Sequence, residues 1–272
     1  MPANPDLRNE IRLEKVSFYY PETEQLVFND LSIDLPAGIT TLVGQNGTGK
    51  STLLLLAAGI LLPVEGTVHL RGIDTRDLRE EQERQHHISF VYQNMEFETE
   101  ESIGELLEYV HKNGFHETKD PELVSELVEV CELRKVLDKK TQEVSKGELQ
   151  RTIIAFSLLY GSKIIMMDEP IFALEGYQKH RIMKYLVEYS RSRNLSLFYS
   201  VHELDISEKY SDYLLLFHKN GRIEMGKTDV LYNRKNIEEA YEVPYIMLKR
   251  KEAIYREALR GRSPDERKGR PG

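Results

Sequence analysis

The chain of 272 residues contains no tryptophan and only one cysteine, Cys131. A single thiol cannot form a disulfide within the chain, so the fold must be stabilised by its core, as is usual in reducing compartments. The simplest role for Cys131 is that of a small apolar residue on a helix.

Long hydrophobic runs are also missing. The longest, Leu53–Leu62, is followed by Pro63 and is shorter than the ~20 residues that a membrane-spanning helix needs. The first residues, MPANPD, lack the charged and apolar regions of a secretion signal. If the protein works at a membrane, we expect another chain to cross it.

Basic charge is in deficit, because 37 Lys and Arg residues stand against 45 Asp and Glu residues, a formal net charge of −8. Such a surface is not suited to nucleic acid unless it carries a local basic patch, and we expect no nucleic-acid partner. Basic residues do concentrate between Lys249 and Arg270. We expect a mobile tail there, exposed to solvent or to anionic lipid headgroups rather than bound to RNA.

A glycine-rich loop, residues 44–51 (GQNGTGKS), is the most informative stretch of the sequence. A short apolar strand is predicted before it, at 39–43, and an apolar helix after it, at 53–62. This order is typical of a phosphate-binding loop, in which glycines let backbone N–H groups approach phosphate oxygens. A glycine-rich turn without a ligand is the simpler alternative. The candidate phosphate-binding residues are Gly44, Gln45, Asn46, Gly47, Thr48, Gly49, Lys50, Ser51 and Thr52.

Two carboxylates, Asp168 and Glu169, follow an apolar segment at 163–167 that predicts a buried strand. Parallel sheets bind ligands at the carboxyl ends of their strands, which is where these groups fall. Asp168 is then placed to hold Mg²⁺, and Glu169 to orient or deprotonate a water molecule. Two acids that merely end a strand before Pro170 are the alternative, which the nearby phosphate loop disfavours.

A predicted helix begins in the segment 144–151 (VSKGELQR). Ser145 and Glu148 fit a capping box, which is a purely structural explanation. Lys146, however, lies beside the positive end of the helix dipole, where a cation is unfavourable. A helix start with Ser145, Lys146 and Gly147 is better explained if it faces an anion.

The remaining chain alternates between strand and helix patterns. Residues 11–20 predict an edge strand with an irregularity at Glu14-Lys15, and helical spacing across 96–144 predicts an inserted helical subdomain. Further strands are predicted at 31–35, 66–70, 88–92, 195–200, 213–217 and 222–225, and helices at 145–159 and 175–193.

Together these motifs resemble the ATP-binding subunits of ATP-binding cassette (ABC) transporters over nearly all of residues 11–228. Six motifs in the family's order are too specific to arise by chance. They are similar to the Walker A motif (44–51), the Q-loop (Tyr92-Gln93), the signature (144–151), the Walker B motif (164–169), the D-loop (173–175) and the H-loop (200–203), and Tyr20 is similar to the aromatic residue that stacks on adenine.

The resemblance implies an α/β fold of the P-loop NTPase, ABC ATPase type, with a mostly parallel core sheet, an antiparallel β subdomain and an inserted α-helical subdomain. We expect the ATPase domain at 1–228, with the helical subdomain at about 96–144, and an appendix at 229–272. The implied ligands are ATP and Mg²⁺, and the implied activity is ATP hydrolysis.

Site roles follow from the same resemblance. Lys50, Glu169 and His202 would be catalytic, with Glu169 as general base. Mg²⁺ would be bound by Ser51, Gln93 and Asp168, and adenine by Tyr20. The residues that would contact ATP held by another subunit are Ser145, Lys146, Gly147 and Glu148.

The implied partners are a transmembrane permease and a second ATPase subunit, either identical or paralogous. The chain is then expected in the cytoplasm, on the inner face of the membrane. Residues 236–245 (NIEEAYEVPY) resemble importers of metal chelates, haem or cobalamin, and residues 72–75 and 91–94 resemble vitamin importers. Import is therefore favoured over export. A soluble ABC ATPase acting on nucleic acid or ribosomes is the alternative, disfavoured because the chain has one cassette and no long coiled-coil insertion.

Departures from the family pattern affect the signature. Lys146 stands where a glycine is usual and Glu148 where a glutamine is usual, whereas the D-loop carries Glu175 in place of aspartate. We expect slower hydrolysis, and a regulatory subunit with little turnover is the alternative interpretation.

The acidic residues after Gln93 are either a solvated face or a dock for a basic helix of the permease: Glu96, Glu98, Glu100, Glu101, Glu105 and Glu108.

Overall fold

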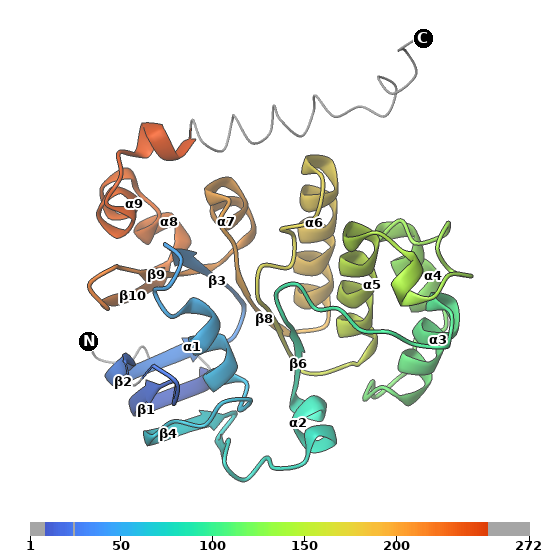
Figure 1. Ribbon diagram of the computed structural model, residues 1–272, viewed down its shortest axis with the longest axis horizontal. Coiled ribbons are helices and arrows are strands. Elements are labelled where there is room, and N and C mark those ends of the chain that lie inside the picture. Colours follow the sequence, from blue (N-terminus) through green and yellow to red (C-terminus); the bar gives the residue numbers. More distant parts are fainter. Residues whose placement is uncertain (1–8, 24, 250–272) are drawn as a thin grey trace.

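The computed structural model describes residues 9–23 and 25–249 (Figure 1). Of the basic residues predicted to form a C-terminal tail, only Lys249 is among them; the rest lie outside the described residues.

A six-stranded sheet forms the centre of the fold, in the order β10-β9-β3-β8-β7-β6. All neighbouring strands are parallel except β9 and β10, which pair antiparallel through the turn at 218–221. Its strands are β3 (Ile39–Gly44), β6 (Ile88–Val91), β7 (Ile164–Met167), β8 (Ser196–Ser200), β9 (Tyr213–Phe217) and β10 (Ile223–Lys227). The predicted strands of this sheet are therefore confirmed.

A second, antiparallel sheet has the order β2-β1-β4-β5. It contains β1 (Asn9–Tyr19), β2 (Leu26–Pro36), β4 (Glu65–Leu70) and β5 (Ile73–Asp74). The prediction of an edge strand at 11–20 is wrong, because β1 pairs with β2 on one side and β4 on the other. The predicted irregularity is confirmed, since the register shifts between Leu13 and Val16 and Lys15 has a φ of +50°.

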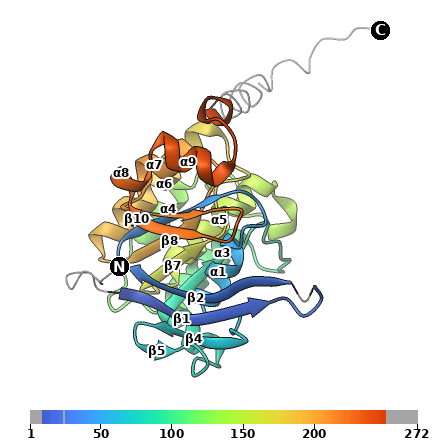
Figure 2. The same cartoon turned by 90° about the vertical axis from the view of Figure 1, so that its left-hand side faces the viewer.

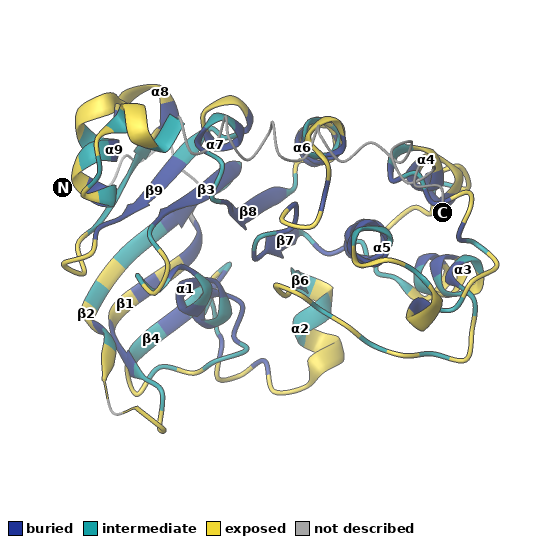
Figure 3. Ribbon diagram, turned by 45° about the horizontal axis from the view of Figure 1, so that its top comes forward, coloured by how far each residue is buried: buried dark blue, intermediate teal, exposed yellow. Residues whose placement is uncertain are grey.

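Helix α1 (Lys50–Ala57) lies between the two sheets, and Figure 3 colours most of it as buried. Leu53 and Leu56 are fully buried there against both sheets. The helix is shorter than the predicted run to Leu62, because Gly59 adopts a φ of +66° and the Gly59 N–H donates back to Leu56 O. A left-handed glycine is a common end of a helix.

The opposite face of the core sheet is covered by α5 (Lys146–Leu159), α6 (Gly176–Ser192) and α7 (Leu204–Tyr210) (Figures 1 and 3). Beyond α5 lie the helices of the predicted helical subdomain, α3 (Ile103–Asn113), α4 (Leu123–Val130) and the short 3-10 helix η1 (Thr141–Glu143). One apolar cluster runs from α3 and α4 through α5 to Ile165 and Met167 of β7. This packing ties the helical subdomain to the core.

Four helices were not predicted: α7, α2 (Glu81–His87), α8 (Thr228–Leu231) and α9 (Arg234–Tyr241). Helix α9 packs through Ile237 and Ala240 against Val43, next to the phosphate loop. Figure 2 shows α8 and α9 at the opposite end of the molecule from β4 and β5. Among the described residues, no helix combines the length and apolar character needed to span a bilayer.

Candidate functional site

The glycine-rich loop joins β3 to α1, as predicted. Gly49 is the residue that caps the start of α1, and its φ of +95° is a conformation that favours glycine. A Cβ atom at this position would lie 2.9 Å from the ring of Phe28 on β2. Both the backbone and the packing therefore require glycine here.

The Lys50 side chain lies inside this loop and is 6% exposed. Its Nζ donates to Gly44 O at 2.9 Å and to Gln45 O at 2.8 Å. Burial lowers the pKa of the Lys50 ammonium group, and the charges of Glu169 and Asp168 oppose that shift. Phosphate oxygens of a bound nucleotide would compete with these two carbonyl oxygens for hydrogen bonds from the Lys50 ammonium group, which already lies inside the loop.

Other residues of the loop are held by local hydrogen bonds. Thr48 Oγ1 donates to Gln45 O at 2.8 Å, and the Gln45 amide donates to Tyr241 O at the end of α9. Tyr20 Oη lies 3.0 Å from Thr52 Oγ1, which brings the predicted adenine-binding ring to the first turn of α1. Asn46 and Gly47 are exposed at the tip of the loop.

Three residues that follow adjacent parallel strands meet, with Glu169 in the middle. Gln93 follows β6, Glu169 follows β7 and His202 follows β8. Gln93 Nε2 donates to Glu169 Oε2 at 3.0 Å, and His202 Nε2 lies 2.6 Å from Glu169 Oε1. Glu169 has a φ of +49°, and such strained residues cluster at functional sites. Both oxygens of this carboxylate are therefore oriented by side chains.

Ser200 fixes the two acids relative to each other. Its hydroxyl donates to Asp168 Oδ1 at 2.5 Å and accepts from the Glu169 N–H at 2.9 Å. Asp168 is buried, with 6% of its surface exposed. Sequence reasoning placed Ser200 in the H-loop but gave it no role. Its position at the end of the strand next to β7 was the available signal.

The residues predicted to hold a metal ion are hard oxygen donors: the Ser51 hydroxyl, the Gln93 amide and the Asp168 carboxylate. Within residues 9–23 and 25–249, no group of three or more His, Cys, Asp or Glu could hold a metal ion by itself. A site with so few protein ligands fits Mg²⁺, which keeps several waters and is usually bound together with substrate phosphates.

The signature residues lie elsewhere. Ser145 caps α5, which lies beyond β7 and β6 from α1 (Figures 1 and 3). The predicted capping box is confirmed: the Ser145 N–H and hydroxyl both donate to Glu148 Oε2 at 2.8 Å, and the Glu148 N–H donates to Ser145 Oγ at 3.3 Å. The backbone hydrogen bond from Ser145 holds the pKa of Glu148 below its ordinary value.

Lys146 is exposed and pairs with Glu96, with Nζ 3.0 Å from Oε1. Gly147 lies against the D-loop, since a Cβ atom there would be 3.1 Å from Ala173 O. The structure thus gathers Gln93, Asp168, Glu169 and His202 at one edge of the sheet beside the phosphate loop. It does not bring residues 145–148 to that loop.

The sequence matches a protein-family model described as ABC transporter over residues 28–172. It is 31% identical over 236 residues to an ABC transporter ATP-binding protein of Archaeoglobus fulgidus, covering 85% of this chain and 96% of that protein. It is 30% identical to the energy-coupling factor transporter ATP-binding protein EcfA1 of Mycoplasma mobile, covering 87% of each chain.

The fold is similar to solved ATP-binding cassettes. One is a dimeric cassette in a post-hydrolysis state with ADP and Pi, matched with a TM-score of 0.69 at 22% identity. The match covers 80% of this chain and 98% of the other. At this level of identity the likeness concerns the fold, an α/β cassette with parallel and antiparallel sheets.

Proposed function

This chain belongs to the ABC transporter family, as an ATP-binding subunit, and from that premise we propose that it hydrolyses ATP at the site around Glu169 to power an importer. The observation that carries the proposal is the cluster of Gln93, Glu169 and His202 beside the phosphate loop. A phosphate loop alone binds nucleotides, whereas a carboxylate oriented on both oxygens can also direct a water molecule.

ATP binding is assigned to the loop and its surroundings. The loop N–H groups and Lys50 would receive the β- and γ-phosphates, and the Tyr20 ring would stack on adenine. Ser51, Gln93 and Asp168 would hold Mg²⁺, which neutralises charge that develops on the phosphates. The burial of Lys50 and Asp168 strengthens their electrostatic effect on a bound phosphate.

Hydrolysis requires a water molecule to attack the γ-phosphorus. Glu169 would accept the proton as the new P–O bond forms, and the bond to the β–γ bridging oxygen would break, leaving ADP and phosphate. His202 would hold Glu169 Oε1 and contact the γ-phosphate. The geometry supports these roles, because both side chains converge at the end of the sheet.

The second half of the ATP site would come from another subunit. Residues 145–148 lie away from this chain's own loop, which supports a function on ATP bound elsewhere (Figure 1). The dimeric cassette with ADP and Pi provides a precedent for the fold. We propose that ATP closes a dimer, of two identical chains or of this chain and a paralogue, and that hydrolysis reopens it.

The proposed membrane partner is a permease, which would place this chain at the inner face of the membrane. The acidic surface of this chain that is proposed to bind the permease contains fewer available carboxylates than the sequence suggested. Three of the six acids already interact with other residues of the chain. Glu96 pairs with Lys146, Glu100 pairs with Lys140, and Glu105 caps α3 by accepting from Ser102.

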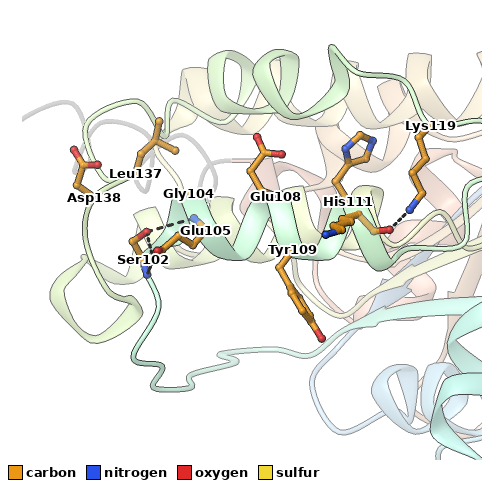
Figure 4. Close-up of a pocket in the computed structure, with 10 residues that line it drawn as sticks. Ser102, Gly104, Glu105, Glu108, Tyr109, His111, Lys119, Leu137 and Asp138 are labelled. Carbon is orange, nitrogen blue, oxygen red and sulfur yellow. Dashed lines mark hydrogen bonds between the residues drawn. The ribbon is translucent and has the colours of Figure 1, made fainter.

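The three other acids support the proposed dock. Figure 4 shows Glu105 beside Ser102, whereas Glu108 extends from the same helix. Glu98, Glu101 and Glu108 are exposed and make no salt bridge in the part of the chain that the structure describes. They remain available to basic residues of a permease.

The test is ATP turnover and ATP-dependent dimerisation of the purified chain, native beside Glu169→Gln. We expect the variant to lose turnover by at least about 100-fold and to accumulate as an ATP-bound dimer. Glu208→Gln removes an exposed acid on α7 and is the matched control. Equal turnover of the native chain and Glu169→Gln would contradict the assignment of the base. A native chain that stays inactive even with a permease present would favour the regulatory alternative.

A further inference from the structure

Glu132 occupies an unusual place at the end of α4. It has a φ of +54°, and the Leu133 N–H donates back to Val128 O at 2.9 Å. Helices that end in this way usually carry glycine at that position, because glycine adopts the conformation without strain. A glutamate at this position suggests that contacts of its side chain compensate for the backbone strain.

The Glu132 carboxylate joins the helical subdomain to α6. Oε2 accepts from Tyr177 Oη at 3.0 Å and from Gln178 Nε2 at 2.8 Å, and Oε1 accepts from Arg181 Nη1 at 3.0 Å. Burial acts to raise the pKa of Glu132, but the hydrogen bonds from Gln178 and Tyr177 and the charge of Arg181 leave it below the ordinary value. The group is therefore an anion that binds three side chains of one helix.

Gln178 connects this carboxylate to two functional segments. It is buried, with 8% of its surface exposed, and its Oε1 accepts from the Glu175 N–H and from Arg151 Nη1, each at 3.3 Å. Arg151 belongs to α5, and its Nε donates to Cys131 O at 2.7 Å. We call Glu132, Arg151 and Gln178 the polar junction.

The D-loop lies between this junction and the proposed general base. At one end the Phe172 N–H donates to Glu169 O at 3.2 Å, and at the other the Glu175 N–H is bound by Gln178. In between, Ala173 O lies so near Gly147 of the signature that a Cβ atom there would be 3.1 Å away. A shift of α4 relative to α6 would therefore act on Glu169 and on the signature together.

We propose that Glu132 and Gln178 are positioning residues, which set the D-loop so that the helical subdomain controls the placement of both Glu169 and Gly147. This inference rests on the proposed function, since it assigns the control of that same ATP site. The rate of ATP turnover would then depend on the helical subdomain, although this subdomain does not contain the phosphate loop.

The most informative variant is Glu132→Gly. Glycine suits the backbone conformation, so this change removes the carboxylate without straining the helix end. Glu129→Gln is the matched control, because it removes a carboxylate one turn earlier that pairs with the exposed Arg134. Glu132→Gln, which keeps an oxygen acceptor for Gln178, serves as the conservative variant.

Two measurements on the full chain test the proposal. Without nucleotide, hydrogen exchange of the Glu175 amide should become about tenfold faster in Glu132→Gly. In steady-state hydrolysis, measured well below the Tm of every variant, kcat should fall about tenfold while the KM for ATP stays within error of the native value. Glu129→Gln should match the native chain, and Glu132→Gln should recover at least half of the lost turnover.

Each contrary result has a distinct meaning. Unchanged exchange at Glu175 would overturn the physical link between Glu132 and the D-loop. Faster exchange with unchanged kcat would overturn the positioning role. A fall in Tm that accounts for the lost turnover would reduce Glu132 to a stabilising contact. Failure of the proposed function would instead be visible in the native chain, as absence of ATP turnover, and would overturn this inference with it.

Discussion

At the scale of single residues, the signature of this chain carries a negative charge of its own where the phosphate of another subunit's ATP is proposed to bind. The Ser145 N–H and hydroxyl are bound by the Glu148 carboxylate, so two donors that would face a phosphate are occupied by an anion of the same chain. A bound phosphate would have to displace Glu148 or tolerate its charge. This gives the expected slow hydrolysis a physical cause beyond the presence of Lys146.

We predict that Glu148→Gln increases ATP turnover of the assembled dimer by about threefold, because it removes a negative charge from the start of a helix that is proposed to face an anion. Lys146→Gly should also increase turnover. The measurement is steady-state hydrolysis at saturating ATP. Glu143→Gln is the control, since Glu143 likewise accepts a backbone N–H from three residues earlier, that of Lys140 at 2.9 Å. Unchanged turnover in both signature variants would contradict a slowing role of this segment.

The same residue gives a pH prediction. The pKa of Glu148 is lowered in the folded chain from an ordinary value of 4.5, so its charge stabilises the fold fully above 4.5, and this contribution is lost below 4.5 as pH falls through the lower folded-state pKa. Glu148→Gln should therefore be less stable than the native chain at pH 7, and the difference should shrink by pH 4. Urea unfolding at the two pH values measures it. A difference independent of pH would show that the carboxylate charge is not involved.

At the scale of elements, the phosphate loop depends on a strand from the other sheet. Phe28 of β2 is buried and its ring faces Gly49. Gly47 is also at positive φ, but a Cβ atom added to it would have no atom within 4 Å beyond those of its own residue and its two chain neighbours. The two glycines thus share a backbone requirement but differ in packing.

We predict that Gly49→Ala destabilises the chain more than Gly47→Ala does, by about 1–3 kcal/mol, the usual cost of overpacking a core. Gly47→Ala should show only the backbone cost, about 1 kcal/mol. Urea denaturation measures both. Adding Phe28→Leu should recover part of the loss in Gly49→Ala and none in Gly47→Ala. Equal losses in the two alanine variants would mean that Phe28 moves aside freely.

Elements with a strong local pattern could be predicted from the sequence. Apolar runs identified β3 and β7, glycine spacing identified the phosphate loop, and the S-x-x-E pattern identified the cap of α5. Pairing could not be predicted, so β1 was expected at an edge, because alternation reveals the buried face of a strand and not its neighbours. Ser200 and Gln178 were missed because their roles arise only when β7, β8 and α6 are brought together.

At the scale of the whole molecule, the exposed acids that are proposed to bind the permease belong to a different segment from the residues that are proposed to hydrolyse ATP. Glu98 and Glu101 lie on the segment before α3 and Glu108 lies on α3, whereas Glu169 follows β7 of the core sheet. A partner can therefore be recognised at one part of the surface while ATP is hydrolysed at another.

We predict that reversing the three acids to lysine weakens association with the permease about tenfold at low salt and reverses its salt dependence, because the lysines would repel basic residues of the permease and salt would screen that repulsion. Glu105 is kept, since its loss would uncap α3. The control reverses Glu22, Glu65 and Glu208, which are exposed elsewhere. Co-purification across a series of salt concentrations is the measurement. Equal association and salt dependence in both triple variants would contradict a dock at this face.

The order of the strands has a consequence for how the protein is made. Strand β3, which carries the phosphate loop, has β8 and β9 as its neighbours in the described sheet, and these begin at Ser196 and Tyr213. During translation at ~5–20 residues per second, β3 leaves the ribosome on the order of ten seconds before either neighbour exists. The ATP site therefore cannot assist early folding. Nucleotide binding instead requires a chain whose synthesis has passed β9, and until then β3 lacks both of its neighbours in the described sheet.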